Sequence, residues 1–444
     1  MTRRGFLSTT AAGALAAAPA RSRNPNFIVF LLDDLGYGDL GCQGATDVKT
    51  PNIDALAASG ARFTDWYACA PVCAPSRASL LTGRYPQRCG VPGNGQLLRP
   101  SEQTIAQVLK PQGYATAAIG KWHLGGTADT DPNSHGFDYY FGFHDGCVDY
   151  YSHRFYWGEP KRVNFHDLWR NREEVFEDGE YLTELITREA KQWLTAHRSE
   201  PFFLYVPYNA VHYPMHAPRK YTDRFQHLEP ERRMYAAMLS AADDGIGEIM
   251  SLMKQQGLLE NTLVIFAGDN GATREPRAGL NQQLAKGGTT GPLRGCKFSV
   301  FEGGIRVPMI MSRPGTIPKG QVIREVGMHA DLLPTFASAA GASLPSDRTI
   351  DGRDILPMAT SQARSPHQAL YWDSTGQLAV RRGQWKLVLN GTIMGETVAG
   401  DDTVFLSNLD ADIGERRNMR HEHADMAAQL QRQIEMWRKD VLNP

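Results

Sequence analysis

The sequence predicts an α/β fold, in which a large, mostly parallel or mixed sheet is sandwiched by helices. Short apolar runs alternate along the chain with segments of helical periodicity, which is typical of successive βα units. The first run is continuous rather than alternating, as expected for a strand that helices cover on both faces. With 444 residues, the chain is long enough for one large domain and a smaller appended unit.

Five apolar runs predict strands of the large sheet, at residues 27–32, 115–119, 202–206, 263–267 and 307–311. A helix is predicted between the second and third runs, because five apolar side chains share one helical face: Leu182, Leu185, Ile186, Trp193 and Leu194. A second predicted helix ends at Gly257 and has its own apolar face: Met234, Met238, Ile246, Ile249, Met250 and Met253.

The character of the chain changes after about residue 340. Residues 379–389 alternate as in a hairpin that turns around Arg382 and Gly383, and residues 424–438 have the pattern of a terminal helix. We therefore expect a main domain over residues 23–340. Residues 341–444 are expected to form a smaller α+β subdomain with an antiparallel hairpin and a terminal helix.

Residues 1–22 have the pattern of a targeting segment. Arg3 and Arg4 precede Phe6 and Leu7, an alanine-rich stretch follows, and residues 18–20 form a small-residue cleavage site. This arrangement resembles a twin-arginine export signal, which predicts a periplasmic or extracellular location for the mature protein. The alternative is a short N-terminal helix, which Pro19 and the polar residues after it disfavour.

Charge and composition exclude several classes of protein. Lys and Arg number 47 against 48 Asp and Glu, and the net charge of -1 gives no electrostatic footprint for nucleic acid. No apolar run approaches the roughly 18 residues that a membrane span needs. The six cysteines are scattered without zinc-ligand spacing, and their disulfide pairing stays open.

Polar side chains follow four of the predicted strands. Because ligands bind at the carboxyl ends of strands in open α/β sheets, we expect these groups to share one crevice. An aspartate after a single strand is more often a turn former or a helix cap, but four such strand ends together favour a site. The residues are Asp33, Asp34, Lys121, His123, His212, Asp269 and Asn270.

Four of these residues predict a metal site. Asp33, Asp34, Asp269 and Asn270 offer oxygen ligands alone, which suit a hard cation. We expect Ca²⁺, with Mg²⁺ as the alternative, because zinc favours histidine or cysteine ligands.

Cys73 is predicted to lie at the N-terminus of a helix. Pro75 suits the first turn and Gly83 is suited to end the helix. Free backbone amides and the helix dipole favour an anion there, and Arg77 adds positive charge one turn later. The alternative is a buried or disulfide-bonded structural cysteine.

The segment CAPSRASLLTGR, residues 73–84, resembles the C-x-P-x-R-x-x-x-x-T-G motif of the type I, formylglycine-dependent sulfatases. These arylsulfatase-like enzymes belong to the alkaline phosphatase superfamily. Five further segments are similar to that family and follow its order: the Asp33–Asp34 pair, GKWHLG at 120–125, the segment that begins at His212, GDNG at 268–271, and LRGCKFSVFEGGIRVP at 293–308.

The resemblance implies a role for each candidate residue. Cys73 would be converted to formylglycine and supply the nucleophilic oxygen. Arg77 would orient it, and Lys121 and Lys297 would neutralise the sulfate oxygens. His212 would protonate the leaving alcohol, and His123 would act as the base that releases sulfate. The implied metal ligands are Asp33, Asp34, Asp269, Asn270 and the modified Cys73.

The resemblance also implies an exported sulfatase that acts on sulfate esters of carbohydrates and that needs a formylglycine-generating maturation enzyme. Two alternatives are a phosphodiester or phosphonate monoester hydrolase of the same superfamily and a non-catalytic relative that binds calcium or glycans. Cys296 and Phe298 depart from the family, which mostly has small residues there, and this leaves the substrate open. The aromatic-rich residues 139–169 could contact a sulfated sugar or simply pack.

Overall fold

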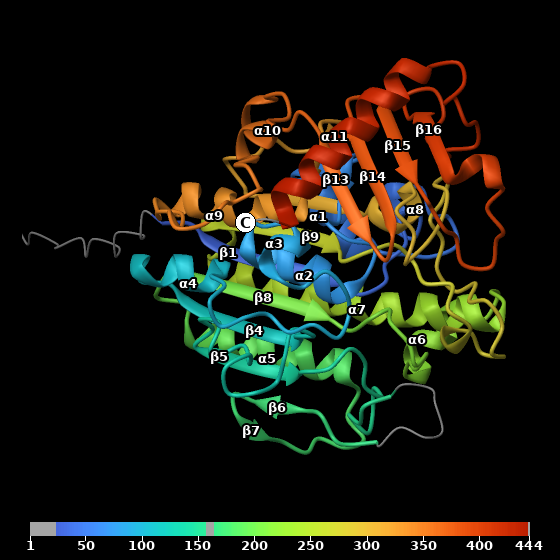
Figure 1. Ribbon diagram of the computed structural model, residues 1–444. Coiled ribbons are helices and arrows are strands. Elements are labelled where there is room, and N and C mark those ends of the chain that lie inside the picture. Colours follow the sequence, from blue (N-terminus) through green and yellow to red (C-terminus); the bar gives the residue numbers. More distant parts are fainter. Residues whose placement is uncertain (1–23, 157–163, 443–444) are drawn as a thin grey trace, which may run out of the picture.

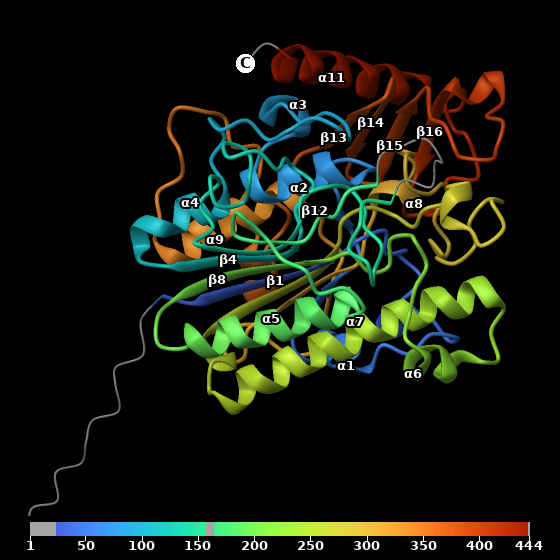
Figure 2. The same ribbon diagram turned by 90° about the horizontal axis from the view of Figure 1, so that it is seen from below.

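The computed structural model describes residues 24–156 and 164–442, and in it a central sheet lies between two layers of helices (Figures 1 and 2). The predicted export signal lies outside the described residues. The sheet has ten strands, in the spatial order β11 (Gln321–Ile323), β2 (Ala61–Phe63), β10 (Met309–Ser312), β9 (Thr262–Gly268), β1 (Asn26–Leu32), β8 (Phe202–Tyr208), β4 (Ala115–Lys121), β5 (Tyr139–Phe143), β6 (Trp169–Arg170) and β7 (Glu173–Glu174).

The predicted fold class is confirmed, and the sheet is mixed. In the centre of the sheet, strands β9, β1, β8, β4 and β5 run parallel to one another. Strand β10 is antiparallel to β9 and β2. It begins two residues later than the predicted 307, because the Val307 N–H bonds to the Trp66 carbonyl and Pro308 has no N–H to donate.

Strand β1 shows how the sequence forms the two layers. Its side chains alternate between the faces of the sheet, and all seven residues are buried. Ile28 and Phe30 pack into the cluster under α1 (Pro51–Ser59), α5 (Leu182–Ala196) and α7 (Pro230–Gln255). Phe27 and Val29 pack into the opposite cluster, with α2 (Cys73–Thr82), α4 (Ile105–Leu109) and α9 (Leu332–Ala340). Figure 2 shows the helices on both sides of the sheet.

A four-stranded antiparallel sheet lies toward the C-terminus, with α11 (Ala424–Leu442) packed against it (Figure 1). The predicted hairpin is β14 (Gln377–Arg382) and β15 (Trp385–Leu389), and the sequence analysis missed its outer neighbours β13 (Leu370–Ser374) and β16 (Val404–Asn408). The remaining α-helices and strands of the described residues are α3 (Pro86–Cys89), α6 (Arg219–Thr222), α8 (Glu302–Ile305), α10 (Leu356–Ser361), β3 (Trp66–Tyr67) and β12 (Gly327–Met328).

No helix within residues 24–156 and 164–442 is both long and apolar enough to cross a membrane. All six cysteines are free, so none of the open disulfide pairings forms.

Buried ion pairs join the C-terminal sheet to the main sheet. Lys386 on β15 is fully buried and contacts Glu302 of α8 at 2.8 Å and Glu415 at 3.1 Å. Arg381 on β14 pairs with Asp65 at 2.7 Å. Taking charges out of water is costly, so removal of one partner leaves its counter-charge buried without compensation.

We therefore expect Lys386→Met to lower the stability of the protein by about 3–5 kcal/mol, because Glu302 and Glu415 would lose their shared cation. Lys110→Met is the matched control, since Lys110 pairs with Asp138 at 2.6 Å but both side chains are 46% exposed. The control should change stability by about 1 kcal/mol or less. Thermal and urea midpoints measure both changes, and equal losses in the two variants would contradict the structural role of the buried network.

Candidate active site

The polar residues that follow the four predicted strands gather at one edge of the sheet. Strands β9, β1, β8 and β4 are adjacent and parallel, so their carboxyl ends point the same way. Backbone hydrogen bonds hold the loops together at this edge: the Asp33 N–H donates to the Ala210 carbonyl and the Asp269 N–H to the Leu32 carbonyl, both at 3.0 Å. Tertiary contact thus brings together side chains, such as those of Asp34 and Asn270, that are 236 residues apart in the sequence.

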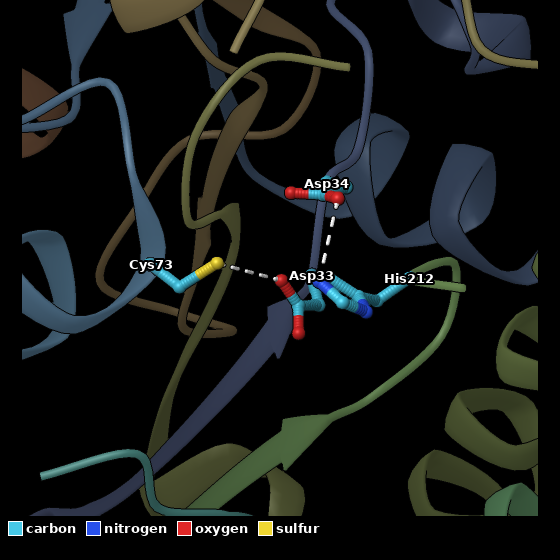
Figure 3. Close-up of side chains that lie close together, drawn as sticks. All are labelled: Asp33, Asp34, Cys73 and His212. Atoms are coloured by element: carbon cyan, nitrogen blue, oxygen red, sulfur yellow. Dashed lines mark hydrogen bonds and ion pairs between the residues drawn. The ribbon is translucent and has the colours of Figure 1, made fainter. Parts of the chain in front are cut away.

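Asp33, Asp34, Cys73 and His212 form the centre of this site (Figure 3). Each offers one ligand atom, and these atoms all lie within 4.8 Å of one another. The Cys73 thiol donates to Asp33 Oδ1 at 3.4 Å, and His212 Nε2 lies 3.8 Å from Asp34 Oδ2. All four residues are buried.

The predicted helix at Cys73 is confirmed as α2, which begins at Cys73 and ends before Gly83. Gly83 has a φ of 70°, a left-handed conformation that ends the helix without the strain a larger side chain would feel. The Ala74 N–H donates to the Asn94 side chain at 3.0 Å. The Ser76 hydroxyl donates to the Asp269 carbonyl at 2.5 Å, which ties the first turn of the helix to the end of β9.

Three cations surround the acidic centre. Arg77 donates to Asp269 Oδ2 from Nη2 at 2.8 Å and from Nε at 3.1 Å, and its Nη2 lies 3.6 Å from Asp33. The Lys121 ammonium donates to Asp33 at 2.5 Å. Lys297 Nζ lies 2.8 Å from Asp34 Oδ1 and 3.0 Å from Oδ2. The three carboxylates are therefore paired with three positive charges.

This charge balance shifts the pKa values of the acids in different directions. Burial alone would raise the pKa of Asp33, but the charge of Lys121 and the other cations hold it well below its usual value. Burial and the negative charge of Asp33 raise the pKa of Asp34 to about 7, although the charge of Lys297 lowers it. The pKa of Asp269 is also raised by burial and by Asp33. Asp33 is thus the carboxylate most strongly held in its ionised form.

The pKa values of the Cys73 thiol and the Lys297 ammonium also shift in this environment. Burial, followed by the charge of Asp33, raises the pKa of the Cys73 thiol well above its usual value, which agrees with its role as a hydrogen-bond donor. Burial would lower the pKa of Lys297, but Asp34 raises it well above its usual value. The contact with Asp34 thus favours the charged form of Lys297.

The two candidate histidines present different atoms to the site. His212 Nδ1 lies 2.7 Å from the Tyr213 carbonyl, which can only accept, so Nδ1 carries a hydrogen and Nε2 faces the acidic centre. His123 has a φ of 59°, and its Nδ1 is buried without a hydrogen-bond partner among the described residues. A Cβ at Gly146 would lie 2.8 Å from His123 Nε2, so the His123 ring would have to move to admit a larger residue there. Burial, aided by Lys121, lowers the pKa of His123 well below its usual value.

The residues fit a hard divalent cation. The Asn270 amide donates to Asp34 Oδ1 at 2.8 Å, while its own Oδ1 is buried without a hydrogen-bond partner among the described residues. A buried oxygen of this kind is costly unless it has a partner such as a metal ion. Both oxygens of Asp269 also have hydrogen-bond partners: Arg77 donates to one, and the Asp34 N–H donates to the other at 3.1 Å.

The sequence analysis missed several residues that contact this site. The Tyr213 ring lies against the His212 ring at a tilt of 30°, with ring centroids 4.1 Å apart, and Glu275 lies 3.8 Å from Lys297. Asn94 caps the start of α2. Tyr213 could have been found from its position beside His212, whereas Glu275 and Asn94 lie in loops that carry no sequence signal of their own.

The aromatic-rich residues 139–169 mostly pack in the interior. Phe141, Phe143 and Tyr150 belong to one core cluster and Tyr140 to the other. Trp157 lies outside the described residues. Packing is therefore the main role of this segment among the residues that the structure describes.

Comparisons with known proteins agree with this arrangement. The family model described as Sulfatase matches residues 25–342, and the one described as N-sulphoglucosamine sulphohydrolase, C-terminal, matches residues 296–440. N-acetylgalactosamine-6-sulfatase of Mus musculus is 36% identical over 404 residues, which cover 86% of this chain and 74% of the mouse protein. Arylsulfatase A of Homo sapiens is also 36% identical, over 84% of this chain and 76% of the human protein.

A likeness to solved structures extends over nearly the whole chain. The crystal structure of Ps i-CgsB superposes with a TM-score of 0.83 at 32% identity, over 93% of this chain and 92% of that chain. The same protein has been solved in complex with k-i-k-neocarrahexaose. These matches include the site edge of the sheet as well as the C-terminal sheet.

Proposed function

The chain belongs to the sulfatase family and is a sulfuric ester hydrolase, and from this premise we propose that it cleaves sulfate esters of carbohydrates with formylglycine at Cys73 and a divalent cation. The observation that carries the proposal is the placement of Cys73. It lies at the start of α2, in contact with Asp33 and among three buried cations. The names of the relatives and the k-i-k-neocarrahexaose in the Ps i-CgsB complex support a sulfated sugar as substrate.

The metal would be held by Asp33, Asp34, Asp269 and Asn270, together with the modified residue 73. When bound, the cation and the formylglycine hydrate would supply a hydroxyl of lowered pKa as nucleophile. We propose Ca²⁺, with Mg²⁺ as the alternative, because the donors are hard oxygens. The orphaned Asn270 Oδ1 supports this assignment.

The chain's own side chains would do the remaining work. Lys121 and Lys297 are buried cations that would bind the sulfate oxygens and neutralise the charge that develops on them. Arg77 would hold the reacting residue in position, since it reaches both Asp269 and the Lys121 carbonyl, the latter at 3.1 Å. These groups are held in place before substrate binds, so little reorganisation is needed during the reaction.

Two histidines would move the protons. His212 Nε2 faces the site while Nδ1 bonds to a carbonyl, so Nε2 is the atom that would protonate the leaving alcohol. His123 would accept a proton in the step that releases sulfate. Its unpartnered Nδ1 supports a role as a base.

We further propose that residues 23–340 form the catalytic domain and residues 341–444 a C-terminal subdomain. Residues 1–22 would direct export by a twin-arginine route, so that the mature enzyme works in the periplasm or outside the cell, among polymers too large to import. Because that route carries folded proteins, a formylglycine-generating enzyme would modify Cys73 before export.

Matched sulfate and phosphate esters test the reaction type. We expect the purified enzyme to hydrolyse 4-nitrophenyl sulfate and N-acetylgalactosamine 6-sulfate with a higher kcat/KM than the corresponding phosphates, because the chain belongs to the sulfatase family. Steady-state kinetics with both series measure this. A strong preference for phosphate would replace the proposal with a phosphoester or phosphonate hydrolase.

The mass of the tryptic peptide 63–77 tests the modification. In protein from its native host, we expect an aldehyde at Cys73 and an unmodified thiol at Cys69, which is the internal control. Cys73→Ala should lower kcat by about a thousandfold or more, because the nucleophile is lost. Its thermal midpoint should stay close to that of the wild-type enzyme. Full activity in this variant would rule out Cys73 as the nucleophile.

Calcium titration tests the metal site. We expect added CaCl₂ to raise the thermal midpoint, because a ligand that binds only the folded state stabilises it. Asp34→Asn should remove most of this shift, since it removes one charged oxygen from the centre. Asp243→Asn is the control, because Asp243 is buried but bonds to the N-terminus of α1, with its Oδ1 2.8 Å from the Ile53 nitrogen. An equal calcium shift in both variants would speak against the assigned ligands.

A further inference from the structure

We propose that Phe298 is a substrate-contacting residue that selects for esters whose leaving alcohol carries a ring, a pyranose in the case of sugar sulfates. This inference rests on the proposed function. It assigns the ring face of the substrate to a residue for which the reaction chemistry has no use. Three independent features of Phe298 lead to it.

The first feature is the backbone conformation. Phe298 has a φ of 71°, in the left-handed region that bulky side chains adopt rarely and at a cost in conformational free energy. Glycine would occupy the same conformation without that cost. Strained residues of this kind persist where the surrounding structure holds them, and they are concentrated at functional sites.

The second feature is the way in which the backbone is held. The Phe298 N–H donates to the Pro71 carbonyl at 2.9 Å, two residues before Cys73. Its carbonyl accepts from Gln377 Nε2 at 2.7 Å. Gln377 is buried at the start of β14, and its Oε1 in turn accepts from the Val300 N–H at 3.3 Å and the Thr392 N–H at 3.0 Å. The C-terminal sheet and the loop before α2 therefore hold Phe298 between them.

The third feature is the environment of the ring. Phe298 is partly exposed, and it belongs to none of the hydrophobic clusters that the described residues form. Instead, Lys297 Nζ lies 5.7 Å from the centre of the ring, while the same ammonium contacts Asp34. The ring therefore flanks the proposed sulfate-binding cation and keeps a face that packing has not used.

These features together fit a binding surface beside the ester. If Lys297 holds a sulfate oxygen, the first ring of the leaving alcohol lies within reach of the Phe298 side chain. An aromatic face buries the apolar face of such a ring and excludes water from it. Since this contact is made equally in the ground state and in the transition state, it acts on KM rather than on kcat.

The test compares Phe298→Gly with the wild-type enzyme. For 4-nitrophenyl sulfate and for N-acetylgalactosamine 6-sulfate, we expect KM to rise about tenfold with little change in kcat. The inhibition constant of inorganic sulfate, which has no ring, should stay the same. The thermal midpoint should not fall, because glycine relieves the left-handed strain. Phe298→Tyr keeps the ring and should restore KM.

Gln362→Gly is the matched control for backbone strain. Gln362 is an exposed residue with a φ of 55° at the end of α10, so its replacement relieves the same kind of strain away from the site. Its KM values should not change.

The outcomes separate the two proposals. An unchanged KM for both substrates in Phe298→Gly would overturn the inference, and so would a rise confined to the aryl ester, because the sugar would then not touch the ring. A lower thermal midpoint together with weaker sulfate inhibition would show a structural role and would also overturn it. If the wild-type enzyme with formylglycine at residue 73 hydrolysed no sulfate ester at all, the proposed function would fail first and the inference with it.

Discussion

The balance of buried charge around Asp33 is the constraint on which the rest of the site depends. Four adjacent parallel strands end at one edge of the sheet, and the loops that follow two of them carry Asp33, Asp34 and Asp269 into the interior. Three carboxylates in one buried volume would repel one another strongly without compensation. Arg77 and two lysines supply that compensation from α2, from the end of β4 and from the loop before α8. Each of these elements is therefore held in place by charge as well as by packing.

The position of Cys73 follows from the same arrangement. The first turn of α2 is tied to the end of β9 by the Ser76 hydroxyl and by Arg77, so the helix begins where the acidic centre lies. A helix N-terminus favours negative charge, and an oxyanion bound there would meet the dipole as well as the three cations. The geometry thus suits a reaction in which an anionic ester binds beside the helix N-terminus and these cations, and negative charge develops on its leaving group.

The C-terminal sheet takes part in the site, although no strand of it carries a candidate catalytic residue. Gln377 at the start of β14 holds the backbone at Phe298, and Lys386 pairs with Glu302, a few residues further along the same loop and helix. The loop that positions Lys297 is consequently held from both sides. Substitutions that disrupt the C-terminal sheet should therefore alter the geometry of the candidate active site, because the buried ion pairs and the glutamine side chain connect the two.

The sequence by itself determined the layered fold, the main strands and the candidate residues of the site. Apolar runs such as FIVFLL predict buried strands, and a polar pair directly after such a run is expected at the carboxyl end of the strand. Short strands such as β6 and β12 left no periodic signal, because two residues are too few to show one. Only the tertiary structure decided which partner each charge meets: Asp269 with Arg77, Asp34 with Lys297, and the left-handed Phe298 beside that lysine. These contacts join residues far apart in the chain through packing and backbone geometry, and local sequence encodes neither.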